Sequence, residues 1–205
     1  MRTYKLLTSV VVSLWLLSGA AHGAVLLNDN FDTENGGVGQ LNYSGLANFN
    51  IANAGSGGAV DLIGNGFFDF YPGNGLYVDI CGSSSACGVL STKQIFGPGN
   101  YTITLHIAGN ARSDSTDAVN VSFGSFSTSF PLTAFQVATE VLNVSLIAPS
   151  TLMIGDQGVL GPDVGDILLS VEVETAGATV PEPASLALLG IGLAGLGFSR
   201  RRKSN

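Results

Sequence analysis

The feature that most constrains the fold is a repeated alternation of apolar and polar residues. Residues 101–109 read YTITLHIAG, in which every second side chain up to Ile107 is apolar. Successive side chains of a β-strand point to opposite faces, so this period of two predicts a strand with one buried face. The same pattern recurs in GLYVDIC, DAVNVSFG, EVLNVSLI and DILLSVEVE, which are residues 75–81, 117–124, 140–147 and 166–174.

Shorter or less regular runs predict further strands. They occupy residues 24–28, 46–51, 58–64, 67–71, 88–96 and 150–155. Clusters of Gly, Pro and Asn separate the runs and predict turns. About ten short strands without a helical period predict one all-β domain over residues 24–175, an antiparallel, jelly-roll-like β-sandwich.

The first 23 residues predict a secretory signal peptide. Arg2 and Lys5 give a positive start, residues 6–17 are mostly apolar, and small residues follow. This order is typical of an export signal, with cleavage between Gly23 and Ala24. Cleavage after Ala20 and a buried N-terminal helix are the alternatives.

The last 30 residues combine a linker, an apolar run and a basic end. Residues 184–198 carry no charge, and Arg200, Arg201, Arg202 and Lys203 hold four of the chain's eight Lys and Arg residues. The run is shorter than the roughly 20 residues that usually span a bilayer, but long basic side chains can extend its reach. The basic cluster predicts a stop-transfer signal that stays in the cytoplasm. We therefore expect a linker at 176–183, a transmembrane helix at 184–199 and a cytoplasmic tail at 200–205; the alternative is a C-terminal helix packed on the sandwich.

The tail VPEPASLALLGIGLAGLGFSRRRK resembles the PEP-CTERM sorting signal of Gram-negative bacteria that make exopolysaccharide. Val180, Pro181, Glu182 and Pro183 match its opening, and the glycine-rich apolar run and arginine-rich end follow in order. The resemblance implies export through the translocon, transient retention in the inner membrane, and cleavage by exosortase before release at the cell surface. Pro181 and Pro183 favour extended backbone, which suits recognition by a protease.

Residues 75–124 resemble the β-rich domains that often precede such tails, including an Ala-Gly-Asn-x-Arg turn at 108–112. That resemblance implies a protein of the extracellular matrix, associated with biofilm or exopolysaccharide, and no defined reaction. The chemistry of the residues is consistent with this. Between Ala24 and Val180 the chain has two basic and fourteen acidic residues, a net charge of −12, which disfavours binding to nucleic acid.

Enzymatic chemistry has little support in the sequence. After the signal peptide His106 is the one histidine, and it alternates with apolar residues on an expected strand. A two-histidine metal site within one chain is thereby excluded, and a Ser-His-Asp relay would have to use this residue. Because this segment has fourteen acidic residues, some pair of carboxylates can always be proposed as a glycosidase pair, so their presence does not indicate glycosidase activity. We expect a non-catalytic protein, and the alternative is a carbohydrate-binding module, with the aromatic stretch GNGFFDFYPGNG at 64–75 as the segment to inspect.

Cys81 and Cys87 flank a short loop of Gly, Ser and Ala. In an exported protein this spacing predicts a structural disulfide.

Acidic residues gather near both ends of the domain, and chain ends often lie close together in a domain. Asp29, Asp32 and Asp166 are therefore candidate calcium ligands. The alternative is that they are solvated loop acids, and no other cofactor is expected.

Overall fold

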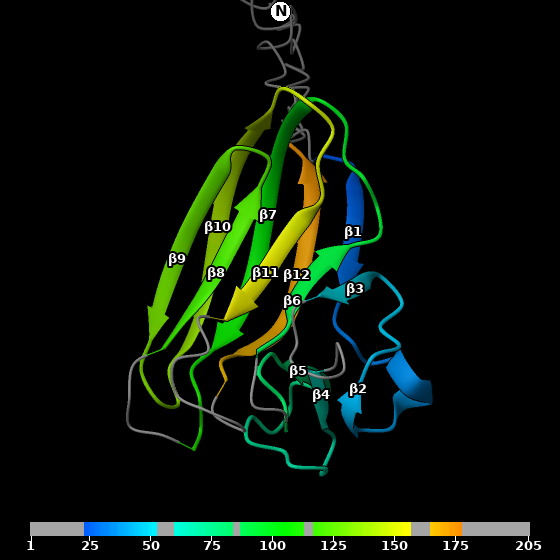
Figure 1. Cartoon of the computed structure of the whole chain (residues 1–205), viewed down its shortest axis with the longest axis vertical. Helices are drawn as coiled ribbons and strands as arrows, with labels where there is room; N and C mark the ends of the chain where they lie inside the picture. Colours follow the sequence, from blue (N-terminus) through cyan, green and yellow to red (C-terminus); the bar gives the residue numbers. More distant parts are fainter. Residues whose placement is uncertain (1–22, 53–59, 84–86, 113–116, 157–164, 178–205) are drawn as a thin grey trace, which may run out of the picture. The chain divides into compact units, whose positions relative to one another are not determined.

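The computed structural model describes residues 23–52, 60–83, 87–112, 117–156 and 165–177, which belong to one compact unit from Gly23 to Gly177. Two antiparallel sheets pack face to face in this domain (Figure 1). The predicted all-β sandwich is confirmed. The expected signal peptide, transmembrane helix and basic tail lie outside the described residues, among which no helix is long and apolar enough to cross a membrane.

The larger sheet has seven strands in the order β10–β7–β12–β5–β4–β2, with β1 also paired to β12. Its strands are β1 (Val25–Asp29), β2 (Gln40–Tyr43), β4 (Val60–Gly64), β5 (Leu76–Asp79), β7 (Gly99–Ala108), β10 (Val137–Leu146) and β12 (Ile167–Thr175). One edge of β12 pairs with β7 along its length, and the other edge pairs with β5 near its start and β1 near its end.

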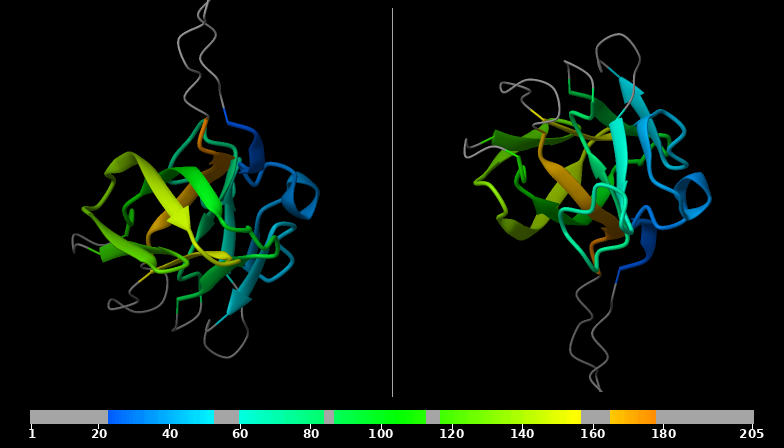
Figure 2. Two further views of the ribbon diagram at one scale, coloured as in Figure 1. Left: turned by 90° about the horizontal axis from the view of Figure 1, so that it is seen from above. Right: turned by 90° about the horizontal axis from the view of Figure 1, so that it is seen from below.

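The smaller sheet has five strands in the order β3–β6–β11–β8–β9. They are β3 (Phe49–Ala52), β6 (Val89–Thr92), β8 (Asp117–Phe123), β9 (Phe126–Leu132) and β11 (Leu152–Asp156). A short 3-10 turn, η1 (Glu34–Gly37), joins β1 to β2. The views along the long axis in Figure 2 show the strands around a common core, with the blue segment that contains η1 at one flank.

The alternating apolar residues meet between the two sheets, as the period of two requires. Ile103, Leu105 and Ile107 of β7 are fully buried there, as are Val119 and Val121 of β8. Phe96, Tyr101 and Phe123 form three edge-to-face ring pairs with centroids 5.3–5.7 Å apart. This geometry is favoured for aromatic rings and adds to the stabilisation from burial.

The aromatic stretch at 67–71 is a loop, so the strand predicted there is wrong. Positive φ angles at Asn65, Gly66 and Phe68 turn the chain back over the larger sheet. The Tyr77 hydroxyl accepts hydrogen bonds from the Phe70 and Tyr71 amides and donates one to Asp69. The loop thereby covers the outer faces of β4 and β5 and encloses a second, small apolar cluster that includes Ile63, Tyr71, Tyr77, Ile167 and Leu169.

Two strands were not predicted. β2 is short and only half-buried, and β9 is an edge strand with Pro131 near its end. Proline removes a backbone donor and is tolerated at a sheet edge, where one side of the strand needs no partner. In β9 the half-buried residues Phe126, Thr128 and Phe130 do alternate with exposed ones, but serine and threonine weaken the apolar signal.

The two ends of the domain leave it side by side. Val25 of β1 lies opposite Glu174 of β12, and the Ala24 amide donates to the Thr175 hydroxyl at 2.8 Å. The start of β12 lies at the far end of the sandwich, with β4 and β5 (Figure 1). The domain thus has one end where the chain enters and leaves and an opposite end free of termini.

Replacing Gly165 by Ala should destabilise the domain. A Cβ atom at this position would lie 2.4 Å from the Cys81 Cβ and 2.5 Å from its backbone nitrogen, so β12 and the disulfide loop would have to move apart. Overpacking of this kind typically costs about 1–3 kcal/mol. Gly97→Ala is the matched control because nothing lies within 4 Å of the place that its Cβ atom would occupy. Chemical denaturation measures the free energy of unfolding of both variants, and equal stability of the two would contradict the close packing at Gly165.

Candidate functional site

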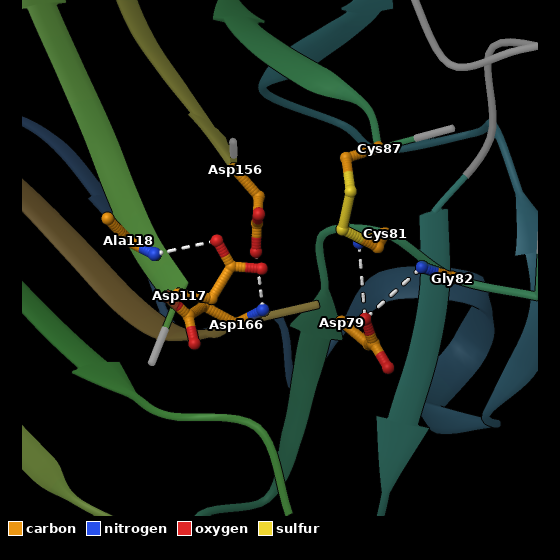
Figure 3. Close-up of a disulfide and its surroundings, with 8 residues drawn as sticks. All are labelled: Asp79, Cys81, Gly82, Cys87, Asp117, Ala118, Asp156 and Asp166. Atoms are coloured by element: carbon orange, nitrogen blue, oxygen red, sulfur yellow. Dashed lines mark hydrogen bonds between the residues drawn. A yellow bond between two sulfur atoms is a disulfide. The ribbon is translucent and has the colours of Figure 1, made fainter. Parts of the chain in front are cut away.

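Four aspartates gather at the end of the sandwich that carries no termini. Asp79 ends β5, Asp117 begins β8, Asp156 ends β11 and Asp166 comes just before β12. Asp117, Asp156 and Asp166, here named the acidic cluster, lie on one side of the view in Figure 3, and Asp79 lies beside the disulfide. Because β12 belongs to one sheet and β8 and β11 to the other, the acidic cluster lies where the two sheets meet.

Short contacts hold the carboxylates of this region in place. The Asp166 amide donates to Asp156 Oδ2 at 2.6 Å, and the Ala118 amide donates to Asp117 Oδ1 at 2.9 Å. The Cys81 and Gly82 amides both donate to Asp79 Oδ1, at 3.2 and 3.1 Å. The Ile80 amide donates to the Asp166 carbonyl oxygen, so the disulfide loop and the start of β12 are joined through the backbone.

Several buried polar atoms in this region have no hydrogen-bond partner among the described residues. They are both carboxylate oxygens of Asp166, Oδ2 of Asp117 and Nδ2 of Asn110. Asp166 is 0% exposed and Asp117 is 4% exposed. An unpartnered buried polar group costs roughly 1–3 kcal/mol, and more if it is charged. Native proteins leave few such atoms, so their concentration in one place requires an explanation.

Burial and crowding of like charges change the acidity of two of these groups. Burial raises the pKa of Asp166 to about 8, and the charges of Asp156 and Asp117 add to the rise. The backbone amide of Asn110 offsets part of it. Burial likewise raises the pKa of Asp79 to about 7, partly offset by the Gly82 amide. In both cases the largest cause is the one expected when a carboxylate leaves water.

The predicted disulfide between Cys81 and Cys87 is present and borders the acidic cluster. A carboxylate oxygen of Asp156 and both sulfur atoms lie within 4.8 Å of one another. Cysteine binds metals as a thiolate, and the two cysteines are oxidised to each other. These three residues therefore do not make a sulfur-ligated metal site.

The structure gives Asp29 and Asp32 a different role from Asp166. Asp29 accepts hydrogen bonds from the Phe31 amide and the Asn48 side chain, and Asp32 accepts them from the Leu76 amide and the Asn30 side chain. Asp29 pairs with Val171 of β12, five residues beyond Asp166 and roughly 15 Å along an extended strand. The three calcium candidates are thus not brought together; Asp29 and Asp32 instead order the segment around η1.

Arg112 connects the aromatic loop with the acidic end. Its guanidinium lies 4.8 Å from the Phe70 ring centroid and 5.9 Å from that of Phe68. Its charge also lowers the pKa of Asp79, against the larger effect of burial. Phe67 and Phe68 form an edge-to-face pair and are 37% and 48% exposed. The aromatic stretch therefore presents two rings at the surface, and the rest of it packs on the sheet.

A second surface feature is an open groove of about 500 Å³ on the smaller sheet. Asn120 and Ser122 of β8 alternate with buried core residues and so point away from the core. Together with neighbouring side chains they give a lining rich in hydroxyl and amide groups. The lining residues are Val89, Asn120, Val121, Ser122, Ser127, Thr128, Ser129, Met153, Gly155 and Asp156.

His106 lies on the outer face of β7, where the sequence placed it. It is exposed, and its Nδ1 is 2.9 Å from the Thr139 hydroxyl of β10. Among the described residues no hydrogen bond joins its ring to a carboxylate, and the acidic cluster lies at the end of the domain. A catalytic relay through His106 therefore has no geometric support in the described part of the chain.

Comparison with protein families decides the identity of the tail. The PEP-CTERM protein-sorting motif matches residues 179–203. The chain carries a PEP-CTERM sorting motif. Val180, Pro181, Glu182 and Pro183 open it and Arg200, Arg201, Arg202 and Lys203 close it, as the sequence resemblance indicated. The motif implies a transiently membrane-anchored precursor, recognition by exosortase and export.

No curated protein matches the chain. Solved structures with a partial likeness include the CBM22-1–GH10 modules of a Clostridium thermocellum xylanase in complex with xylohexaose, at 16% sequence identity and a TM-score of 0.46. The match covers 78% of this chain and 30% of that one. Another is the CBM36-1 domain of a multidomain xylanase from the hindgut metagenome of Trinervitermes trinervoides, at 17% identity and a TM-score of 0.40. The match covers 64% of this chain and 100% of that domain's chain. At such scores these structures do not indicate what this chain binds.

In metal-free buffer the domain should lose stability as pH rises from about 5 to 8. The pKa values of Asp166 and Asp79 are raised in the folded protein, to about 8 and about 7. The unfolded chain therefore releases these protons near pH 4, while the folded domain keeps them until pH 7–8. Each carboxyl lowers the free energy of unfolding by at most about 1.4 kcal/mol for each pH unit in that window. Urea unfolding at several pH values measures how the free energy of unfolding changes with pH, and Asp166→Asn should reduce this pH dependence. An equal pH dependence in the variant and the unmodified chain would contradict this account.

Proposed function

We propose that the protein is an exported, exosortase-processed component of the extracellular matrix whose β-sandwich works without catalysis. The observation that carries the proposal is the PEP-CTERM motif at residues 179–203, preceded by one compact unit from Gly23 to Gly177. Cleavage at the motif would separate the domain from the apolar run and the four basic residues. The released domain would keep the strongly negative charge of the segment between Ala24 and Val180.

A non-catalytic role is supported by the chemistry of the described residues. His106 lies apart from the aspartates, of which Asp79, Asp117 and Asp166 are buried. A general acid or base must reach a substrate, and Asp166 has no exposed surface. The disulfide and the tightly packed Gly165 further rigidify this end of the domain, as expected of a protein that persists outside the cell.

Carbohydrate binding is a second candidate function, and the groove on the smaller sheet is the observation that favours it. Its serine, threonine and asparagine side chains offer donors and acceptors of the kind that pair with sugar hydroxyls. Asp156 is the one acidic residue in the lining, and the other polar groups are uncharged, which would suit a neutral polysaccharide. None of the residues that line the groove is aromatic, so binding would rest on hydrogen bonds and shape.

Replacing Pro181, Glu182 and Pro183 together by alanine should block processing of the chain. Hydrophobicity of the run and the basic end are unchanged, so membrane insertion should continue and the full-length form should accumulate in the inner membrane. Immunoblots of membrane and secreted fractions measure this. Removal of Arg200, Arg201, Arg202 and Lys203 is the contrasting variant, because it should weaken membrane retention before any cleavage. Normal release of the triple-alanine variant would overturn exosortase sorting for this protein.

Glycan binding can be tested with a sequence-matched control. Asn-Val-Ser occurs at residues 120–122 in the groove and again at 143–145 on β10 of the other sheet. Full-length protein in mild detergent should bind a neutral polysaccharide on a glycan array, and Asn120→Ala/Ser122→Ala should weaken this at least about tenfold. Asn143→Ala/Ser145→Ala should bind like the unmodified chain. Equal loss in both variants, or no binding to any glycan, would reject the groove.

A further inference from the structure

Five of the described strands have a neighbouring strand on one side only: β1, β2, β3, β9 and β10. The free side of such an edge strand has unpaired backbone N–H and C=O groups, and proteins usually protect it by shortness, proline, lysine or a β-bulge. Four of the five edges have a feature of this kind. β2 and β3 have four residues each, β1 has five with a register shift after Val25, and β9 contains Pro131.

β10 is the edge strand without these features. It has ten residues, Val137–Leu146, contains neither proline nor lysine, and pairs with β7 at every position without a register shift. Val137 and Val141 on its outer face are 57% and 56% exposed, and Phe135 and Ile147 next to its ends are 63% and 89% exposed. Figure 1 shows β10 at one flank of the sandwich. We propose that the free edge of β10 is an interface at which two copies of the domain pair, strand against antiparallel strand.

The sequence of β10 is complementary to a second copy of itself. Two copies of one edge strand that are related by a twofold axis run antiparallel, and the contact closes at two copies. With the axis at Val141, the two Val141 side chains face each other. Thr139 then faces Asn143 of the second copy, and Val137 faces Ser145. Directly opposite Cβ atoms lie about 4.5–5.5 Å apart, so valine packs on valine and a hydroxyl meets an amide.

Glu140 favours this register over its neighbours. It is the one charged residue of β10 and lies half-buried on the inner face of the strand, in alternation with the exposed residues. An axis at Glu140 would place two carboxylates directly opposite each other, which destabilises a strand pair. An axis at Leu142 would place Glu140 against Val144, which is 4% exposed, and bury the charge further. An axis at Val141 places it against the half-buried Leu142 instead.

Light scattering after size exclusion of the full-length chain in mild detergent tests the interface. The chain should be a dimer, and Val141→Lys should weaken association at least about tenfold, because lysine on an edge strand opposes pairing. Val38→Lys is the matched control, since Val38 is 62% exposed and lies between η1 and β2. This control should associate like the unmodified chain. A monomeric unmodified chain, or equal association of the two lysine variants, would overturn the proposal.

Introduced cysteines test the register by a gain rather than a loss. Val141→Cys should form a disulfide-linked dimer on a non-reducing gel, because the two opposite Cβ atoms would lie close to the roughly 3.5–4.5 Å that a disulfide needs. Val137→Cys alone should stay unlinked, since it would face Ser145, and Val137→Cys/Ser145→Cys should link. Linkage of Val137→Cys alone, or no linkage of Val141→Cys, would reject the pairing about Val141.

Charge should oppose this association, which separates it from an electrostatic contact. The segment between Ala24 and Val180 has a net charge of −12, so two copies repel each other, and the proposed contact consists of backbone groups and mostly uncharged side chains. Raising sodium chloride from 0.05 to 0.5 M should therefore tighten the dimer by screening the repulsion. Glu140→Gln should tighten it as well, by removing two nearby like charges. Dissociation by salt, or weaker association of Glu140→Gln, would contradict the proposed pairing.

Discussion

The pairing of β12 with three other strands is the constraint on which the rest of the structure depends. One edge of β12 follows β7 throughout, and the other edge is divided between β5 and β1. β12 therefore runs from the end of the domain that carries no termini to the end where the chain enters and leaves. Its last residues meet the start of the domain at Ala24 and Val25, and the residue before its start contacts Ile80 and Asp156. Any change in the register of β12 would disturb both ends together.

The end that begins β12 concentrates the unfavourable interactions of the domain. Burial of carboxylates costs free energy unless hydrogen bonds or a cation compensate for lost hydration. Asp79 is compensated by two backbone amides and by the charge of Arg112. Asp166 has weaker compensation, from the backbone amide of Asn110 alone, and the tight contact of Gly165 with Cys81 holds the adjoining backbone in place. Such a local cost persists only where the surrounding structure fixes the groups that carry it.

The chain also separates two tasks along its length. The PEP-CTERM motif contains the proline pair, the apolar run and half of the basic residues, and it governs export. The sandwich has a different chemistry, with two basic against fourteen acidic residues between Ala24 and Val180 and a polar groove on the smaller sheet. Because sorting is read from a short local segment, the domain needs no residue for it. Its surface is therefore free to serve the proposed matrix role.

The sequence by itself determined whatever depends on local order. Alternation in the five clearest segments predicted β5, β7, β8, β10 and β12, because a period of two indicates a β-strand with one buried face. The sorting motif was also readable, because the positions of Pro181, Glu182 and Pro183 before the apolar run and the basic end are themselves the signal. The short loop between Cys81 and Cys87 pointed to their disulfide for the same reason.

Only the tertiary structure decided which distant residues meet. The chain positions of Asp29, Asp32 and Asp166 suggested one group, but Asp29 pairs near the end of β12, and Asp166 lies at its start. Asp117 had no local mark beyond standing at a strand end, and packing of the two sheets brought it to the end of the sandwich where Asp156 and Asp166 also lie. The aromatic stretch at 67–71 was misread because Phe70 and Tyr71 pack on the outer face of β4 and β5 while Phe67 and Phe68 stay exposed, a division that no alternation along the stretch records. Sheet order and packing are properties of the whole chain, so no local pattern can contain them.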